Sequence, residues 1–265
     1  MKTYFVDSFT SEKFKGNPAA VCFPETELEV DTMQKVANEI GFSETAFIRP
    51  ISDNTYNIRF FTPKMEIPLC GHAALASSKI IFETTSFEKI KFININQVEL
   101  YIEKEKNNIK MFFPVYDTED IEVPIKMLDA LGIIKIVNKR YNPNTKIILI
   151  EIDDAFVLAN LKPDFVALTS TYTGINGVLI TAISNTNGFD FHYRYFWPWA
   201  GTNEDPVTGG VQTFLTKYWA NKLNKTTLNA FQSSLRTGTM QTELLQDKVS
   251  ISGEAVIVLE GQFNL

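Results

Sequence analysis

Two stretches of similar make-up decide the fold: Arg59-Phe-Phe-Thr-Pro63 and Arg194-Tyr-Phe-Trp-Pro198. Each is a run of aromatic residues typical of a strand, ends at a proline, and is followed by a loop and a helical segment. The loops have equal length, because eleven positions lead from each arginine to Cys70 or to Asp205. A strand, a proline, a loop of the same length and a helix in both halves indicate an internal duplication.

The regions around these stretches contain short segments rich in β-branched and aromatic residues, which predict strands. Apolar residues at helical spacing, or a run rich in Ala and Leu, predict three helices. The proline-containing, acidic segment 114–123 is the best boundary, so we expect halves at 1–115 and 116–265. The expected strands are 2–6, 19–23, 45–48, 56–61, 91–95, 98–103, 109–113, 147–152, 156–158, 177–183 and 189–196, and the expected helices are 31–40, 72–83 and about 208–222.

Composition excludes several classes of protein. The 265 residues are 45% hydrophobic and 21% charged, which supports a folded core. The net charge is -6 and no basic block occurs, so a nucleic-acid partner is not expected. No apolar run reaches the roughly 18 to 20 residues of a membrane span, and the first residues do not resemble a signal peptide. Two cysteines, Cys22 and Cys70, are too few for a disulfide framework, so we expect a cytoplasmic protein.

The starts of two predicted helices are candidates for binding a small anion. The first turn of a helix has unpaired N–H groups and a partial positive charge, which bind a carboxylate without a basic side chain. Gly71 precedes one start, and Gly209 and Gly210 lie at the other. A tight turn alone explains any single one of these glycines. Their occurrence in both halves favours a small carboxylate, bound in a cleft between the halves.

Three side chains are candidates for acid-base catalysis: Glu44, His72 and Asp205. His72 lies at a helix start beside Cys70, whereas His192 lies inside an alternating strand, where packing explains it. Glu44 is flanked by apolar residues, so burial is expected to raise its pKa towards a value useful for moving protons. A surface glutamate near a strand start is the alternative. Asp205 also fits the cap of the helix that follows it.

Other kinds of chemistry have no support in the sequence. No GxGxxG, GxxxxGK[ST] or GxSxG motif occurs, and the few cysteines and histidines match no zinc spacing. We therefore expect neither a nucleotide cofactor nor a metal. The kind of reaction that the sequence still supports is acid-base chemistry on a small carboxylated molecule.

These residues resemble the motifs of the PhzF-like family of phenazine-biosynthesis isomerase homologues, within the diaminopimelate epimerase fold. The similarity extends over nearly the whole chain and is specific in order and spacing. The matching pieces are Val6-Asp-Ser-Phe-Thr10, Phe14-Lys-Gly-Asn-Pro-Ala-Ala-Val-Cys22, Gly41-Phe-Ser-Glu-Thr-Ala-Phe47, Arg59-Phe-Phe-Thr-Pro63, Cys70-Gly-His-Ala73, Arg194-Tyr-Phe-Trp-Pro198, Glu204-Asp-Pro-Val-Thr-Gly209 and Arg236-Thr-Gly238.

The resemblance implies an α+β fold of two pseudo-symmetric domains, each a curved, mostly antiparallel sheet wrapped around a central helix. It also implies an active site between the domains, a homodimer and no cofactor. The last few residues of the chain are expected to join the first domain.

The resemblance further implies roles for individual residues. In the characterised isomerase of the family, a glutamate matching Glu44 moves a proton between carbons of a cyclic amino acid, a dihydro-hydroxyanthranilate. A histidine matching His72 and an aspartate matching Asp205 surround the substrate. The implied substrate-binding positions are Gly71, Ala73, Thr208, Gly209 and Gly210.

One departure from the family pattern concerns the substrate. The usual Thr-Gly-Ser-Ala-His is Thr208-Gly-Gly-Val-Gln212 here, so a hydroxyl is missing at Gly210 while the backbone N–H remains. A water can replace that hydroxyl. We expect a cofactor-independent isomerase. The alternatives are a carboxylate-binding protein that has lost turnover, or an amino-acid epimerase that uses Cys70, although the second loop has Asp205 and no cysteine.

Overall fold

The computed structural model describes residues 1–265 and divides the chain into two compact units, Met1–Phe113 with Ser250–Leu265, and Pro114–Val249. The division falls at the first residue of the segment 114–123. The first unit takes in the whole of Ser250–Leu265, which is more than the last few residues expected for it. None of the helices combines the length and the apolar composition that a bilayer crossing demands.

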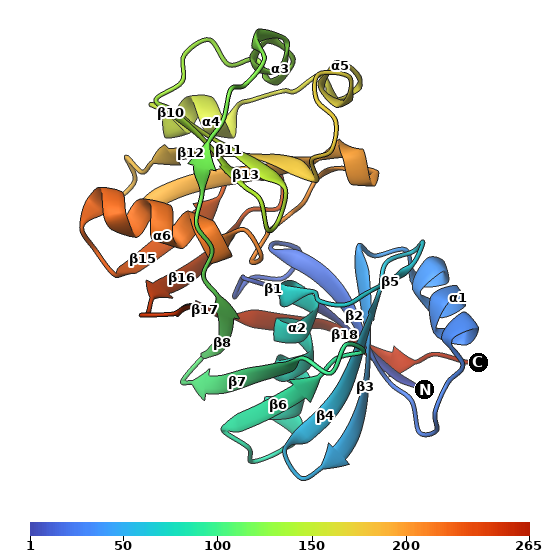
Figure 1. The fold of residues 1–265 in the computed structure, drawn as a ribbon. Helices are drawn as coiled ribbons and strands as arrows, with labels where there is room; N and C mark the ends of the chain where they lie inside the picture. The colour runs from blue at the N-terminus through green and yellow to red at the C-terminus, as the bar shows by residue number, and fades with distance from the viewer. The chain divides into compact units, whose positions relative to one another are not determined.

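The first unit is a mixed, mostly antiparallel sheet that curves around one helix, α2 (Figure 1). Two pairs of its strands are parallel, β2 with β3 and β4 with β6. The helix α1 packs against β3 and β4. The elements are β1 (Lys2–Ser8), β2 (Asn17–Phe23), α1 (Val30–Ile40), β3 (Glu44–Ser52), β4 (Thr55–Phe61), β5 (Glu66–Ile67), α2 (Gly71–Thr84), β6 (Lys89–Ile93), β7 (Glu99–Glu105), β8 (Asn108–Pro114) and β18 (Ala255–Gln262), with β17 (Lys248–Gly253) spanning the division of the chain.

Helix α2 is the core of the first unit. Ten of its fourteen residues are buried, as expected for a helix that is apolar on every side. Most of the buried residues are Ala, Ser, Ile or Leu, and the small ones let strands approach closely. The hydroxyls of Ser77 and Ser78 donate to the carbonyls of Ala73 and Ala74, so these buried polar groups are satisfied.

The second unit has the same succession of strand pairings. Its parallel pairs are β11 with β12 and β13 with β15, and the other pairings are antiparallel. Helix α6 packs on β15 and β16, and α4 packs on β12 and β13. The elements are β9 (Glu119–Asp120), α3 (Ile125–Leu131), β10 (Asn138–Asn142), β11 (Ile147–Ile152), α4 (Ala155–Ala159), α5 (Phe165–Thr169), β12 (Gly177–Ile183), β13 (Phe191–Trp197), the 3-10 helix η1 (Pro198–Ala200), β14 (Thr202–Glu204), α6 (Gln212–Leu223), β15 (Thr227–Gln232) and β16 (Gly238–Leu244).

The arginine of each duplicated stretch makes the same contacts in its own unit. Arg59 on β4 donates two hydrogen bonds of 2.7 Å to Glu66 on the next short strand. Arg194 on β13 donates two of 2.7 Å to Glu204 on β14. Each guanidinium also lies over the phenylalanine two residues along its strand. Each of these Arg–Glu pairs therefore fixes the short strand that precedes the loop and the helix.

Two predicted elements are wrong in detail. Residues 156–158 form helix α4 and not a strand, because the Asp154 carboxylate accepts hydrogen bonds from the N–H groups of Phe156 and Val157 and caps a helix. The third predicted helix begins at Gln212 and not near Thr208. Asp205 is therefore not its cap, because the Asp205–Val211 segment lies before the helix.

The duplicated pairs allow a matched test of stability. Arg194 is more buried than Arg59, with side-chain exposures of 9% and 19%. Removing one partner of a buried pair leaves an uncompensated charge, at a cost of about 3–5 kcal/mol. We expect Glu204→Gln to lower the free energy of unfolding in denaturant titrations by about 2–4 kcal/mol, and Glu66→Gln by roughly 1 kcal/mol or less. An equal loss in both variants would contradict this account.

Candidate active site

Glu44 lies at the start of β3, directly after a helix end. Helix α1 stops at Gly41, whose φ of 73° is the left-handed conformation that glycine adopts without strain. The chain then enters β3, in which Glu44 is the first residue and lies beside Ala19 of the parallel strand β2. The Glu44 side chain is 7% exposed. The local turn thus places a carboxylate at the buried start of a strand that is paired on both sides.

His72 and Cys70 come from the start of α2. Cys70 is the residue before the helix, and His72 is in its first turn. The Nε2 atom of His72 is 3.0 Å from Oε2 of Glu44, and the Sγ atom of Cys70 is 3.4 Å from Nδ1 of His72. Ser8 on β1 donates a hydrogen bond of 2.8 Å to the His72 carbonyl. The carboxylate, the imidazole and the thiol therefore form one buried cluster.

Asn17 completes the surroundings of the imidazole. Its side-chain amide is 3.2 Å from Nδ1 of His72, and Asn17 is fully buried. The preceding Gly16 has a φ of 66°, and a Cβ atom there would lie 2.1 Å from the Ser8 carbonyl oxygen. Only glycine fits this turn. The Gly16-Asn17 pair therefore brings the amide against the ring.

The ionisation of Glu44 differs from the prediction. Burial acts to raise its pKa, but the charge of His72 and its hydrogen bond lower it, and the net pKa is below the ordinary value of 4.5. The expectation of a raised pKa is therefore wrong, because the fold brings His72 of a different element to 3.0 Å from the carboxylate. Glu44 is a carboxylate at neutral pH.

The pKa of His72 moves the other way. Burial acts to lower it, but the hydrogen bond with Cys70 and the charge of the Glu44 carboxylate raise it well above the ordinary 6.5. The site therefore holds an imidazolium hydrogen-bonded to a carboxylate. Burial raises the pKa of the Cys70 thiol, and His72 opposes this only in part. Cys70 is thus protonated at neutral pH and is a poor base.

Asp205 belongs to the second unit, in a loop held by its own hydrogen bonds. The buried Gln232 side chain donates to the Asp205 carbonyl at 2.6 Å and accepts from the Thr208 N–H at 2.7 Å. The Thr208 hydroxyl donates to the Asp205 carboxylate. The Tyr193 hydroxyl donates to the Thr208 carbonyl at 3.1 Å. These contacts make the loop rigid, as a preformed binding site requires.

The loop also restricts which groups can bind a substrate. The Thr208 N–H donates to Gln232 on β15 and the Thr208 hydroxyl donates to Asp205, so both of these donors are already used. The N–H groups of Gly209 and Gly210 are the donors that we expect to contact a substrate. A Cβ atom at Gly210 would meet nothing within 4 Å, so a larger residue fits there. In the first unit, Gly71 and Ala73 lie in the first turn of α2, where N–H groups lack helical partners. That Asp205 meets Glu44 and His72 stays a prediction.

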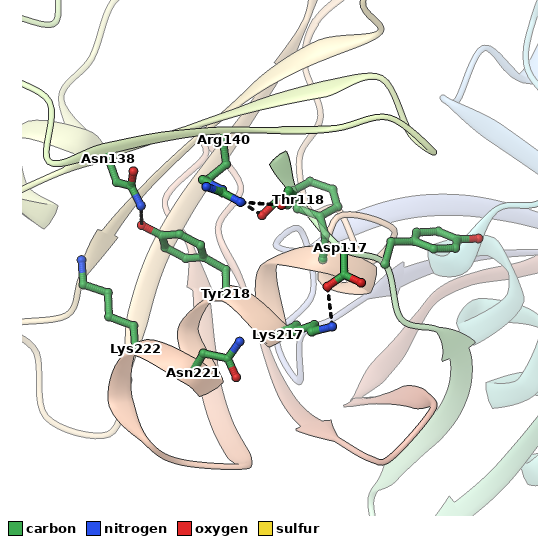
Figure 2. A pocket seen from close by; sticks show the side chains of 10 residues that line it. Asp117, Thr118, Asn138, Arg140, Lys217, Tyr218, Asn221 and Lys222 are labelled. Atoms are coloured by element: carbon green, nitrogen blue, oxygen red, sulfur yellow. Dashed lines mark hydrogen bonds and ion pairs between the residues drawn. The ribbon is translucent and has the colours of Figure 1, made fainter. Parts of the chain in front are cut away.

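A surface pocket of about 450 Å³ lies elsewhere in the second unit (Figure 2). It contains none of the predicted site residues. Its charges are paired with one another or with neighbours. Lys217 pairs with Asp117, as Figure 2 shows. Arg140 pairs with Asp120, and Lys222 pairs with Glu151. Tyr218 donates to Glu151 and accepts from Asn138. This pocket therefore has a structural ion-pair network and not an acid-base site.

Some site residues were not identified from the sequence, and one histidine behaves as expected. Asn17 lies in one of the pieces that match the family but was not singled out as a site residue, and Gln232 carries no signal other than being a polar residue in an apolar strand. His192 on β13 is held between the hydroxyls of Ser184 and Ser233, at 3.2 and 3.3 Å, and burial lowers its pKa. Its structural role is confirmed.

Known proteins are similar to this chain in sequence and in fold. The family model described as "Phenazine biosynthesis-like protein" matches residues 6–261. A protein named as an uncharacterized isomerase from Halalkalibacterium halodurans is 40% identical, over 99% of this chain and 98% of its own. The crystal structure of a PhzF-family protein from Enterococcus faecalis has a TM-score of 0.92 and 36% identity, covering 100% of this chain and 99% of that one. A probable proline racemase from Agrobacterium radiobacter, with 9% identity and a TM-score of 0.67, covers 100% of this chain and 93% of its own and shares the fold alone.

These similarities establish the class of protein to which the chain belongs and, within that class, its family. The α+β architecture is of the diaminopimelate epimerase type, and relatives named isomerases support an isomerase- or epimerase-type function. The chain belongs to the phenazine biosynthesis-like family, the PhzF-like proteins.

The charge of His72 can be measured directly, because the chain has only two histidines. We expect two-bond ¹H–¹⁵N NMR spectra at neutral pH to show one imidazolium, His72, and one neutral ring, His192. The His72 signal should titrate only well above the ordinary pKa of 6.5. A His192→Gln variant assigns the signals by keeping the imidazolium alone. A neutral His72 ring at neutral pH would contradict the assignment.

Proposed function

We propose that the protein is a cofactor-independent isomerase that moves a proton between two carbons of a small carboxylate, with Glu44 as the base. The observation that carries this proposal is the 3.0 Å contact between Glu44 and His72 in a buried cluster. A buried carboxylate that is ionised at neutral pH has the protonation state that a general base requires. The proposed substrate is small and anionic, and probes of cyclic amino acids and hydroxy acids follow from the family resemblance.

In the proposed reaction, the Glu44 carboxylate removes a proton from one carbon of the substrate. The imidazolium of His72 donates a hydrogen bond to that carboxylate and stabilises charge during the transfer. Glu44 then returns a proton to another carbon on the same face. The proton on Glu44 exchanges with water before this step, so in heavy water the substrate gains deuterium. Asp205 is proposed to contact the substrate from the loop of the second unit and to take part in holding or relaying protons.

Binding of the substrate carboxylate is proposed to use backbone N–H groups. The first turn of α2, at Gly71 and Ala73, supplies one set, and Gly209 and Gly210 supply the other. N–H groups at a helix start favour an anion even where no lysine or arginine is present. The homodimer and the cytoplasmic location also remain proposals from the resemblance and the composition.

An epimerase that uses two thiols is less well supported. Inverting a carbon without a cofactor requires a base on each face. Cys70 is protonated because burial raises its pKa, and the Asp205 loop has no cysteine. A single ionised base on one face is better suited to isomerisation than to inversion.

Exchange in heavy water tests the proposal. We expect the protein to exchange a carbon-bound hydrogen of its substrate for deuterium, measured by ¹H NMR across a set of cyclic amino acids and hydroxy acids. Glu44→Gln should reduce the exchange by at least about 10²-fold, whereas Glu83→Gln at the far end of α2 should leave it unchanged. Cys70→Ser should retain exchange. Loss of exchange in Cys70→Ser, with retention in Glu44→Gln, would establish the thiol mechanism instead.

Binding without exchange is a separate outcome. If small carboxylates bind to the protein in calorimetry but no carbon-bound hydrogen exchanges for any probe, the alternative of a binding protein replaces the isomerase.

The glycine at position 210 provides a test of specificity. A serine there adds a hydroxyl in open space, so Gly210→Ser should change the free energy of unfolding by no more than about 0.5 kcal/mol. We expect the relative rates of exchange of different carboxylates to change by several-fold, because the new hydroxyl can donate to some of them and not to others. The measurement is kcat/KM for two or more substrates in both proteins. An unchanged ratio would show that Gly210 does not face the substrate.

A further inference from the structure

We propose that Glu44, Cys70 and His72 form a binding site for a divalent cation of borderline softness, with Zn²⁺ as the best fit. The three side chains supply a carboxylate oxygen, a thiolate sulfur and an imidazole nitrogen, which are the ligand types of zinc sites in proteins. Their ligand atoms lie within 4.8 Å of one another, and the three side chains are buried. The sequence spacing did not predict this site, because Glu44 comes from a different element.

The distances in the cluster match those that a shared ion imposes. Zn–S bonds are about 2.3 Å and Zn–N bonds about 2.0–2.1 Å, so one ion holds its sulfur and nitrogen ligands no more than about 4.4 Å apart. Sγ of Cys70 is 3.9 Å from Nε2 of His72, within that limit. Oε2 of Glu44 is 3.0 Å from the same nitrogen. An ion near Nε2 therefore reaches all three ligands with small side-chain rotations.

The other ring nitrogen has a partner of its own. The Asn17 amide lies 3.2 Å from Nδ1 and fixes the plane of the ring. Metal-bound histidines commonly have such a contact on the second nitrogen, and it orients the ring and fixes its tautomer. With the ion on Nε2, the ring proton is on Nδ1 and is donated to the amide oxygen, which needs only a rotation of the amide group. The imidazolium of the metal-free site also carries a proton on Nδ1, so the same rotation of the Asn17 amide serves both states of the ring.

The choice of ion follows from the donor set. One sulfur, one nitrogen and one oxygen favour Zn²⁺ or Co²⁺, whereas Mg²⁺ and Ca²⁺ require mainly oxygen ligands. Three protein ligands leave a fourth tetrahedral position for water or for a substrate carboxylate. On binding, Cys70 and Nε2 of His72 each release one proton to solvent, and Glu44 binds as the carboxylate. Small residual exposures of 5–7% show that the side chains are not sealed from solvent.

Bound metal and proton transfer exclude each other at this site. The ion takes up the electron pairs of Glu44 and the Nε2 atom of His72, which the proposed reaction uses, so Zn²⁺ is an inhibitor. This consequence rests on the proposed function, whereas the binding itself does not. The two are therefore measured separately.

Cobalt spectroscopy tests the binding without any substrate. We expect Co²⁺ added to the metal-free, reduced full-length protein to produce a thiolate-to-cobalt charge-transfer band in the near ultraviolet, with a stoichiometry of one ion per chain. Zn²⁺ should abolish the band by displacement, and Mg²⁺ should not. Cys70→Ser should remove the band, and His72→Gln should weaken Zn²⁺ binding at least about tenfold in competition with a chromophoric chelator. Cys22→Ser is the matched control and should keep the band, because Cys22 lies outside the cluster.

Several results would overturn the proposal. The absence of a thiolate band in the wild-type protein would do so without any variant, and so would a band that persists in Cys70→Ser or disappears in Cys22→Ser. Circular dichroism of each variant confirms that it is folded. If the band appears as expected but the metal-free protein exchanges no substrate hydrogen, the metal site stands and the proposed function fails. If the metal-free protein exchanges substrate hydrogen but no cobalt band forms, the proposed function stands and the metal site fails.

Discussion

The hydrogen-bonded ion pair between Glu44 and His72 is the interaction on which the candidate site depends. A carboxylate buried alone would take up a proton, because burial disfavours its charged form. The imidazolium at 3.0 Å keeps it ionised, and Cys70 and Asn17 surround the imidazole. Several structural features serve this one contact. The left-handed turn at Gly41 starts β3 at Glu44, the turn at Gly16 places Asn17, and the enclosed helix α2 presents His72 from its first turn.

Much of the fold could be predicted from local patterns. The duplicated stretches indicated the matching strand, loop and helix in both units, and segments rich in β-branched and aromatic residues located ten of the eighteen strands. The four strands after α6 were not predicted. The two Arg–Glu pairs could not be predicted, because Glu66 and Glu204 lie on strands of two and three residues that have no periodicity. Residues 156–158 have strand-like composition, but the Asp154 cap outweighs their propensity in a short segment.

The site could be predicted in its residue types but not in its electrostatics. Glu44, His72 and Cys70 were identified from motifs, and they lie together. The direction of the Glu44 pKa shift depends on a distance between two elements, which no local pattern encodes. Asn17 has no chemical signal of its own, because a buried asparagine beside a glycine is also typical of an ordinary turn. The role of Asp205 remains a prediction, because Asp205 belongs to the second unit whereas Glu44 and His72 belong to the first.

The same electrostatic arrangement supports two chemistries. A carboxylate, an imidazole and a thiol at these distances can move a proton or hold a borderline metal ion, and the protonation of His72 and Cys70 decides which occurs. Acid-base use requires the protonated imidazole, and metal binding requires its deprotonation. A protein that keeps the cluster protonated therefore favours proton transfer until a strongly binding ion competes.

The most direct measurement of the central claim is the titration of Glu44 itself, followed by the ¹³C chemical shift of its labelled side-chain carboxyl. In the wild-type protein we expect the midpoint to lie below the ordinary pKa of 4.5, because the charge of His72 outweighs the effect of burial. In His72→Gln only burial remains as a large influence, and the midpoint should move above 4.5. A Glu44 carboxyl that titrates above this value in the wild-type protein, or at the same pH in both proteins, would contradict the account.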